Sequence, residues 1–223
     1  MSELRDDSRE LRAAVIATAG AMNASGINVN KSGNVSVRCL RGARAGFLLT
    51  PTGVPYERLA ADDIVFVGDD GRAIGRCEPS SEWRFHAAIY RARPELHAVV
   101  HTHSTHATAL ACQGLGIPAF HYMVAVAGGH DIRCAEYATF GTQALADNAL
   151  AALQDRKACL LAHHGVIACA DALDAALALA VEVENLARTY VVVRALGEPR
   201  LLDRAEMERV LERFRTYGPA RRE

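Results

Sequence analysis

Residues 79–107 read PSSEWRFHAAIYRARPELHAVVHTHSTHA and contain three different structural patterns. The residues of PSSE offer hydroxyl caps and a first-turn carboxylate, and the apolar positions that follow are spaced as on one face of a helix. HAVVHTH is typical of a buried strand, and THATALA is typical of a second helix. The stretch therefore predicts a helix, a strand and a helix, with two histidines where the strand ends.

The flanking sequence extends this pattern in both directions. Residues 4–25 predict an amphipathic helix, and VSVR, FLLT and DIVFVGDDGRAIGR predict short strands joined by turns. After residue 107, HYMVAVAGGH predicts a strand and a glycine turn, KACLLAHHGVIAC one buried strand, and ALDAALALAVEVENLARTYVVVRAL a long helix. There is no G-x-G-x-x-G fingerprint. We therefore expect an α/β protein in which residues 1–223 form a single three-layer α/β/α domain around a mainly antiparallel or mixed sheet.

Composition excludes several classes of function. The 223 residues include 25 basic and 26 acidic side chains, and 50% are hydrophobic, which is typical of a globular protein without a nucleic-acid partner. No apolar run approaches the roughly 18 residues of a membrane span. The start, MSELRDDSRE, has no apolar signal core, so we expect a cytoplasmic location. The six cysteines form no C-x-x-C pair and are expected to be reduced.

Histidines in this chain have the spacing of a metal site. His101 and His103 are two residues apart at a strand end, so both imidazoles leave the same face. His163 or His164 offers a third ligand at the end of another apolar run, and Glu82 offers a carboxylate. This donor set is typical of catalytic zinc. The alternative is that these histidines are polar strand-end residues held in a hydrogen-bond network.

An ordered set of motifs resembles the class II aldolase/adducin family, and within it the enzymes that act on L-fuculose 1-phosphate. The motifs are SGNVSVR, LLTPTGVPYE, the stretch 79–107, HYMVAVAGG, YATFGT, LLAHHGVIA and FRTYG. The resemblance implies that one zinc ion per subunit is bound by His101, His103 and, of the double histidine, His164. It also implies that Glu82 is the catalytic carboxylate and can ligate the resting metal.

The same resemblance assigns roles to residues outside the metal site. It implies that Tyr122 reaches the active site of a neighbouring subunit and protonates the aldehyde oxygen. The residues that it places on the substrate phosphate are Gly33, Asn34, Thr52, Gly53, Ser80 and Ser81, and the aromatic residues that it places near the active site are Phe140, Phe214 and Tyr217. Phosphate chemistry agrees, because turns and helix N-termini supply backbone N–H groups and hydroxyls, although turn formation and helix capping would also explain each of these residues singly. In one departure, Asn30 and Lys31 occupy the places of a glycine and a phosphate-binding threonine.

The function implied is a zinc-dependent class II aldolase. It would cleave a ketose 1-phosphate, such as L-fuculose 1-phosphate or a related deoxy-ketose phosphate, to dihydroxyacetone phosphate and an aldehyde. The family resemblance also implies a homotetramer with shared active sites. Two alternatives remain: a pentulose-phosphate 4-epimerase, or a related sugar-phosphate dehydratase or decarboxylase, and an adducin-like binding module without a metal. The intact histidines and Glu82 argue against the binding module.

Overall fold

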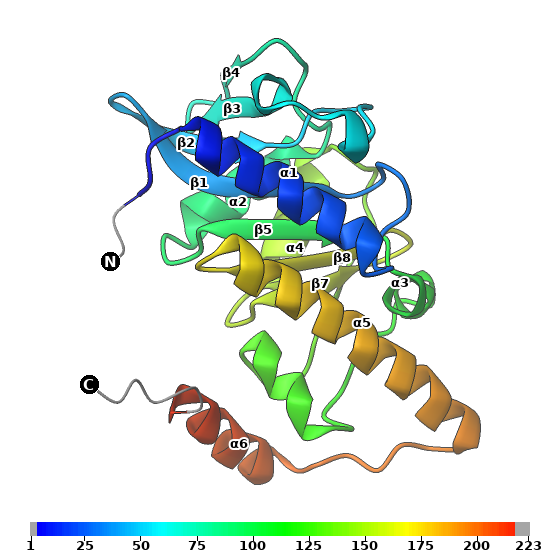
Figure 1. Cartoon of the computed structure of the whole chain (residues 1–223). Coiled ribbons are helices and arrows are strands. Elements are labelled where there is room, and N and C mark those ends of the chain that lie inside the picture. Colours follow the sequence, from blue (N-terminus) through cyan, green and yellow to red (C-terminus); the bar gives the residue numbers. More distant parts are fainter. Residues whose placement is uncertain (1–3, 217–223) are drawn as a thin grey trace.

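A mixed sheet is the centre of the fold in the computed structural model, which describes residues 4–216 (Figure 1). Its strand order is β4-β3-β2-β1-β5-β8-β7-β6, and neighbouring strands are antiparallel except for β6 and β7. The strands described are β1 (Asn34–Arg41), β2 (Arg44–Leu49), β3 (Val65–Gly68), β4 (Ala73–Ile74), β5 (Ala98–Thr102), β6 (Cys134–Ala135), β7 (Ala158–Leu161) and β8 (Gly165–Ala170).

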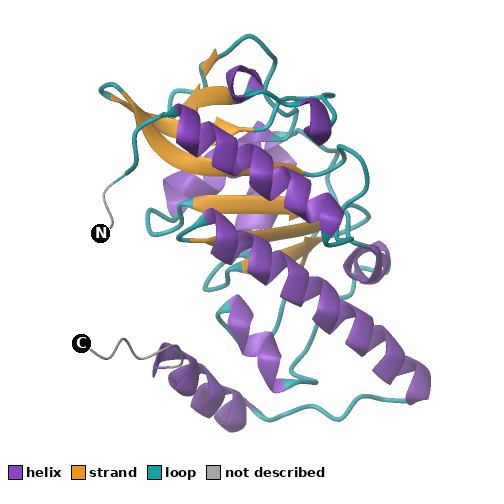
Figure 2. Ribbon diagram, in the orientation of Figure 1, coloured by secondary structure: helices purple, strands orange, loops and turns teal. Residues whose placement is uncertain are grey.

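Helices cover both faces of this sheet. Figures 1 and 2 show α1 (Arg9–Ala24) and α5 (Leu173–Leu196) on one face and α2 (Trp83–Ala92) and α4 (Gln143–Ala152) behind it. Each face has its own apolar core, one containing Leu11 and Val183 and the other containing Phe85 and Leu145. The expected three-layer α/β/α fold is therefore confirmed. The remaining helical elements are η1 (Tyr56–Arg58), η2 (Ala61–Asp63), α3 (Thr105–Cys112), η3 (Tyr122–Ala127) and α6 (Arg204–Thr216).

The opening helix shows how the sequence pattern becomes structure. Ser8 caps α1 by accepting a hydrogen bond from the Leu11 N–H at 3.1 Å. Apolar residues at helical spacing, including Val15 and Met22, are fully buried against the sheet. Among residues 4–216, no helix has both the length and the apolar character that crossing a membrane requires.

Two segments differ from the prediction. HYMVAVAGGH forms the 3-10 helix η3 and no strand, because the His121 side chain accepts the Met123 N–H at 3.2 Å and Gly128 closes the segment in a left-handed conformation. KACLLAHHGVIAC is two antiparallel strands, β7 and β8, and not one. The turn between them is possible because His163 adopts a φ of 56° and the His164 N–H donates to the Leu161 carbonyl oxygen at 3.0 Å.

The start of α2 also differs in detail. Glu82 is the N-cap residue, and no side chain caps the helix, so Ser80 and Ser81 lie before the helix and not at its cap. The Ser80 hydroxyl instead accepts from the Glu82 N–H at 3.4 Å, within the turn that leads into the helix. This placement brings the Glu82 side chain to the end of the central strand β5, beside His101.

Candidate metal centre and substrate cavity

Four side chains predicted as metal ligands meet at one end of the sheet. His101 is on β5, His103 follows that strand, His164 lies in the β7–β8 turn and Glu82 is the N-cap residue of α2. One donor atom from each lies within 4.8 Å of the others. The His101 and His103 Nε2 atoms are 3.0 Å apart, and the Glu82 oxygens are each 3.2 Å from an Nε2 atom, Oε2 from that of His101 and Oε1 from that of His164.

The orientation of these groups fits a divalent metal ion. The His101 Nδ1–H donates to the Val166 carbonyl oxygen at 2.9 Å, so its Nε2 turns a lone pair toward the cluster. Glu82 Oε1 is buried and makes no hydrogen bond among residues 4–216, and His164 Nε2 lies 3.2 Å from it. A buried carboxylate oxygen without a hydrogen bond, facing three imidazole nitrogens, is the arrangement that a bound cation would satisfy.

The protonation states also suit metal binding. Burial and the neighbouring His101 and His164 lower the pKa of His103 to about 3, so its imidazole is neutral near pH 7. Burial raises the pKa of Glu82, but His101 and His164 outweigh it, and the pKa is lowered overall. The cluster therefore offers a neutral His103 imidazole and an ionised Glu82 carboxylate, which are the forms of these groups that coordinate metals.

A cavity of about 290 Å³ opens beside this cluster. Phe140, a predicted active-site aromatic, lines it and is 65% exposed. Its loop packs closely on the Ser81 loop, because a Cβ at Gly141 would lie 2.8 Å from the Ser81 carbonyl oxygen. Sequence reasoning did not select Ser32 or Tyr137, although both are in quoted motifs. The residues that line the cavity are Ser32, Ser81, Glu82, His103, Tyr137, Ala138, Phe140, His163 and His164.

The segments predicted to bind phosphate are close neighbours. A bridge between Pro51 and Pro79 joins the loop containing Thr52 and Gly53 to the loop containing Ser80 and Ser81. The loop before β1, which carries Gly33, is also in contact, because the Lys31 Nζ donates to the Gly53 carbonyl oxygen at 2.8 Å. Ser81 is exposed at the cavity, and Ser80 is buried.

Gly33 and Asn34 have tightly constrained positions. A Cβ at Gly33 would lie 2.3 Å from the His101 carbonyl oxygen, so the close approach of the chain to β5 requires glycine. The buried Asn34 side chain donates to Glu82 Oε2 at 2.9 Å, and its oxygen is 2.6 Å from His86 Nε2. The structure thus gives the Asn34 amide partners other than the phosphate predicted from the sequence.

Comparison with known proteins assigns the family. A model described as the Class II Aldolase and Adducin N-terminal domain matches residues 13–191. The chain belongs to this family. A 5-methylthioribulose-1-phosphate/5-deoxyribulose-1-phosphate aldolase from Rhodospirillum rubrum is 53% identical over 208 residues, which cover 93% of this chain and 92% of that protein.

Two further relatives carry a similar name. The L-fuculose phosphate aldolase of Escherichia coli strain K12 is 49% identical over 205 residues, which cover 92% of this chain and 94% of that protein. A solved structure of an L-fuculose 1-phosphate aldolase has a TM-score of 0.89 at 38% identity, covering 93% of this chain and 97% of that one. The expected enzyme class, a class II aldolase and therefore an aldehyde-lyase, is confirmed.

In this aldolase, two predicted active-site residues lie away from the metal cavity. Tyr122 and Phe214 line a separate cavity of about 320 Å³ between η3 and α6, together with Met123, Val210 and Arg213. Tyr122 is 51% exposed. Tyr217 lies outside the described residues. Neither Tyr122 nor Phe214 is among the residues that line the cavity beside His103.

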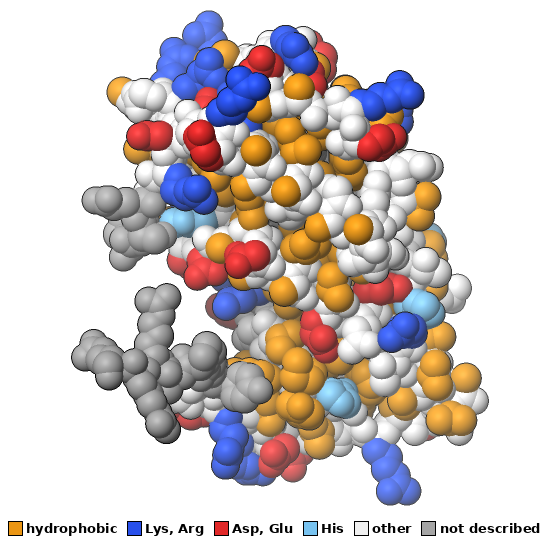
Figure 3. Space-filling view, viewed as in Figure 1, with side chains coloured by type: hydrophobic (Ala, Val, Ile, Leu, Met, Phe, Trp, Pro, Cys, Tyr) orange, Lys and Arg blue, Asp and Glu red, His pale blue; other side chains and the backbone are white. Residues whose placement is uncertain are grey.

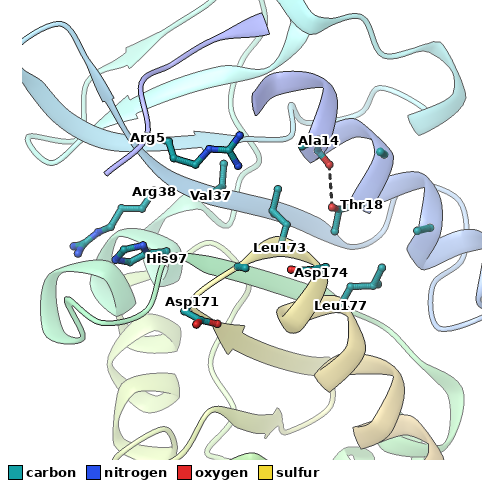
Figure 4. A pocket seen from close by; sticks show the side chains of 13 residues that line it. Arg5, Ala14, Thr18, Val37, Arg38, His97, Asp171, Leu173, Asp174 and Leu177 are labelled. Carbon is teal, nitrogen blue, oxygen red and sulfur yellow. Dashed lines mark hydrogen bonds between the residues drawn. The ribbon is translucent and has the colours of Figure 1, made fainter. Parts of the chain in front are cut away.

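A larger hollow of about 510 Å³ lies at the opposite end of the strands (Figure 4). It is lined by Arg38 and His97 near the sheet and by Leu173 and Asp174 at the start of α5. None of the predicted site residues within the described part of the chain lines it. The chemistry of the aldolase site is therefore assigned to the cavity beside the histidine cluster.

Proposed function

We propose that this class II aldolase uses zinc to cleave a ketose 1-phosphate to dihydroxyacetone phosphate and an aldehyde. The observation that carries the proposal is the cluster of His101, His103, His164 and Glu82 at the cavity that Ser81 also lines. L-fuculose 1-phosphate and 5-deoxyribulose 1-phosphate are the first candidate substrates, because relatives at 49% and 53% identity are named for such compounds. Both are deoxy-ketose 1-phosphates.

The residues of the site would bind the metal, transfer a proton and hold the substrate phosphate in such a reaction. His101, His103 and His164, with Glu82 in the resting state, would hold the metal, which when bound supplies Lewis-acid stabilisation of negative charge on the substrate oxygen. Glu82 would carry the proton at the carbon that bears the developing charge, because it is ionised and keeps Oε1 free of hydrogen bonds. Ser81 and the Thr52–Gly53 turn would hold the phosphate and so position the reacting carbons.

A substrate panel tests this function. Zinc-loaded protein is offered L-fuculose 1-phosphate, 5-deoxyribulose 1-phosphate, 5-methylthioribulose 1-phosphate and pentulose 5-phosphates, and products are identified by NMR. We expect dihydroxyacetone phosphate and an aldehyde from at least one ketose 1-phosphate, and no turnover by the His101→Ala, His103→Ala double variant. Epimerised or dehydrated products alone would contradict the aldolase assignment.

We also propose a cytoplasmic homotetramer in which Tyr122 of one subunit serves the metal site of the next. Tyr122 is exposed and lies apart from its own metal cavity, which supports a role in another subunit. Further apolar residues are exposed toward the end of α5, including Val192 and Leu196. Figure 3 shows hydrophobic side chains grouped over this side of the molecule. The expectation of no nucleic-acid or membrane partner stays a prediction.

A further inference from the structure

A row of buried polar side chains runs from Glu82 into the space between α2 and β1. Asn34 Nδ2 donates to Glu82 Oε2 at 2.9 Å, and Asn34 Oδ1 is 2.6 Å from His86 Nε2. On the other side of the ring, His86 Nδ1 is 2.7 Å from the Ser36 hydroxyl, which is in turn 2.7 Å from the Tyr90 hydroxyl. All five residues are at least nine-tenths buried.

Two regular periodicities build this row. Glu82, His86 and Tyr90 are four residues apart on one face of the α2 segment, and Asn34 and Ser36 are two apart on one face of β1. Four helical residues advance about 6 Å, and two strand residues advance about 6.6 Å. Because these steps nearly match, side chains from the two elements alternate and each contacts the next.

The hydrogen bonds in the row have one direction. An amide NH₂ only donates and a carboxylate only accepts, so the Asn34 oxygen faces His86 and must receive a proton from Nε2. Burial and the nearby His101 lower the pKa of His86 to about 3, which keeps the ring neutral. Nδ1 therefore has no proton and accepts from the Ser36 hydroxyl.

The Ser36 and Tyr90 hydroxyls continue the same direction of hydrogen bonding. Because Ser36 gives its only proton to His86, its oxygen accepts from the Tyr90 hydroxyl at 2.7 Å, which is closer to that hydroxyl than the His97 carbonyl oxygen at 3.4 Å. Burial raises the pKa of Tyr90, so the phenol keeps the proton that it donates. Every proton in the row thus points toward the Glu82 carboxylate, and the alternative tautomer of His86 would set two lone pairs against each other at Asn34.

We propose that Tyr90, Ser36, His86 and Asn34 form a one-way donor chain that orients Glu82 for its role in the aldolase site, with His86 as the positioning residue that sets its direction. The chain holds Glu82 Oε2 and leaves Oε1 free of hydrogen bonds at the metal cluster. The role in turnover rests on the proposed function, whereas the geometry and the effect on metal affinity do not. Hydrogen bonds behind a ligating group commonly change metal affinity by 10- to 100-fold.

The native protein provides the first test. In ¹⁵N NMR spectra of the metal-free chain at pH 7, His86 should be neutral and protonated at Nε2. Protonation at Nδ1, or a charged ring, would overturn the proposed direction of the hydrogen bonds from Tyr90 to Glu82. This measurement needs neither a substrate nor a variant.

A pair of variants tests the effect on Glu82. His86→Gln keeps an N–H donor for the Asn34 oxygen, and His86→Leu removes it. Competition with a chelator should show zinc binding 10- to 100-fold weaker in the leucine variant and close to native in the glutamine variant. In a turnover assay, kcat should fall at least about tenfold in the leucine variant while KM changes little.

The hydroxyl at the far end has a matched control. Tyr90→Phe should weaken zinc binding and lower kcat, each by a few-fold. Tyr190→Phe removes a hydroxyl from a buried tyrosine on α5 that is not part of the donor chain, and it should change neither zinc binding nor kcat. Equal losses in His86→Gln and His86→Leu, or native zinc affinity in the leucine variant, would refute the positioning role. If zinc binding follows these expectations but no ketose phosphate is cleaved, the proposed function fails and the donor chain stands.

Discussion

Replacing Gly165 by alanine should disturb the metal centre without altering any ligand. Gly165 follows the ligand His164 and lies against Thr102, which precedes the ligand His103. A Cβ at Gly165 would be 2.3 Å from the Thr102 carbonyl oxygen and 3.1 Å from His103 Cδ2. The contacting atom on Thr102 is backbone, so a side-chain rotation cannot relieve this clash.

The size of the effect follows from this distance. An ordinary carbon–oxygen contact is about 3.3 Å, so β5 and β8 must separate by about 1 Å at this point. A displacement of about 1 Å near a catalytic group can lower kcat/KM about 100-fold. Overpacking should also lower the free energy of unfolding by about 1–3 kcal/mol.

The assay compares two alanine variants. Gly20 is exposed within α1, and a Cβ there meets no atom within 4 Å, so Gly20→Ala should raise the free energy of unfolding by about 0.5–1 kcal/mol and leave activity unchanged. Urea unfolding, zinc affinity by chelator competition and kcat/KM are measured for both. If Gly165→Ala retains native stability and zinc affinity, the reasoning from strand contact is wrong.

Three further predictions concern other parts of the molecule. Glu82→Gln should weaken zinc binding at least as much as His86→Leu and, at saturating zinc, lower kcat about 100-fold or more, and near-native turnover would place the base elsewhere. Burial raises the pKa of Glu184, but hydrogen bonds from the backbone N–H groups of His106 and Ala107 lower it overall. The ionised Glu184 carboxylate therefore stabilises the fold fully above the unfolded-state pKa near 4.5, and this contribution is lost as the pH falls through the lower folded-state pKa. Glu184→Gln should therefore cost about 2 kcal/mol in urea unfolding at pH 7 and progressively less as the pH falls below about 4.5, whereas a cost independent of pH would refute this. Mixing the inactive variants His103→Ala and Tyr122→Phe should restore some activity if sites are shared, and exchange confirmed by mass spectrometry without recovery would exclude a shared site.

The sequence alone predicted the features that depend on local periodicity. The apolar spacing in residues 4–25 predicts the face of α1 that is buried, because a helix repeats every 3.6 residues wherever it packs. The alternation of a strand likewise predicts that His101 and His103 share a face, and the structure places their Nε2 atoms 3.0 Å apart. Family motifs added the choice of His164 over His163.

Only the tertiary structure decided which distant residues touch. KACLLAHHGVIAC predicted one strand because β7 and β8 are both buried on two faces, and no alternation marks the turn at His163. The partners of Asn34 come from α2 and its N-cap, about 50 residues away in the chain. The separation of Tyr122 from the metal cavity depends on how η3 packs against α6. Local sequence sets which face a side chain leaves, whereas the packing of whole elements sets what that side chain meets.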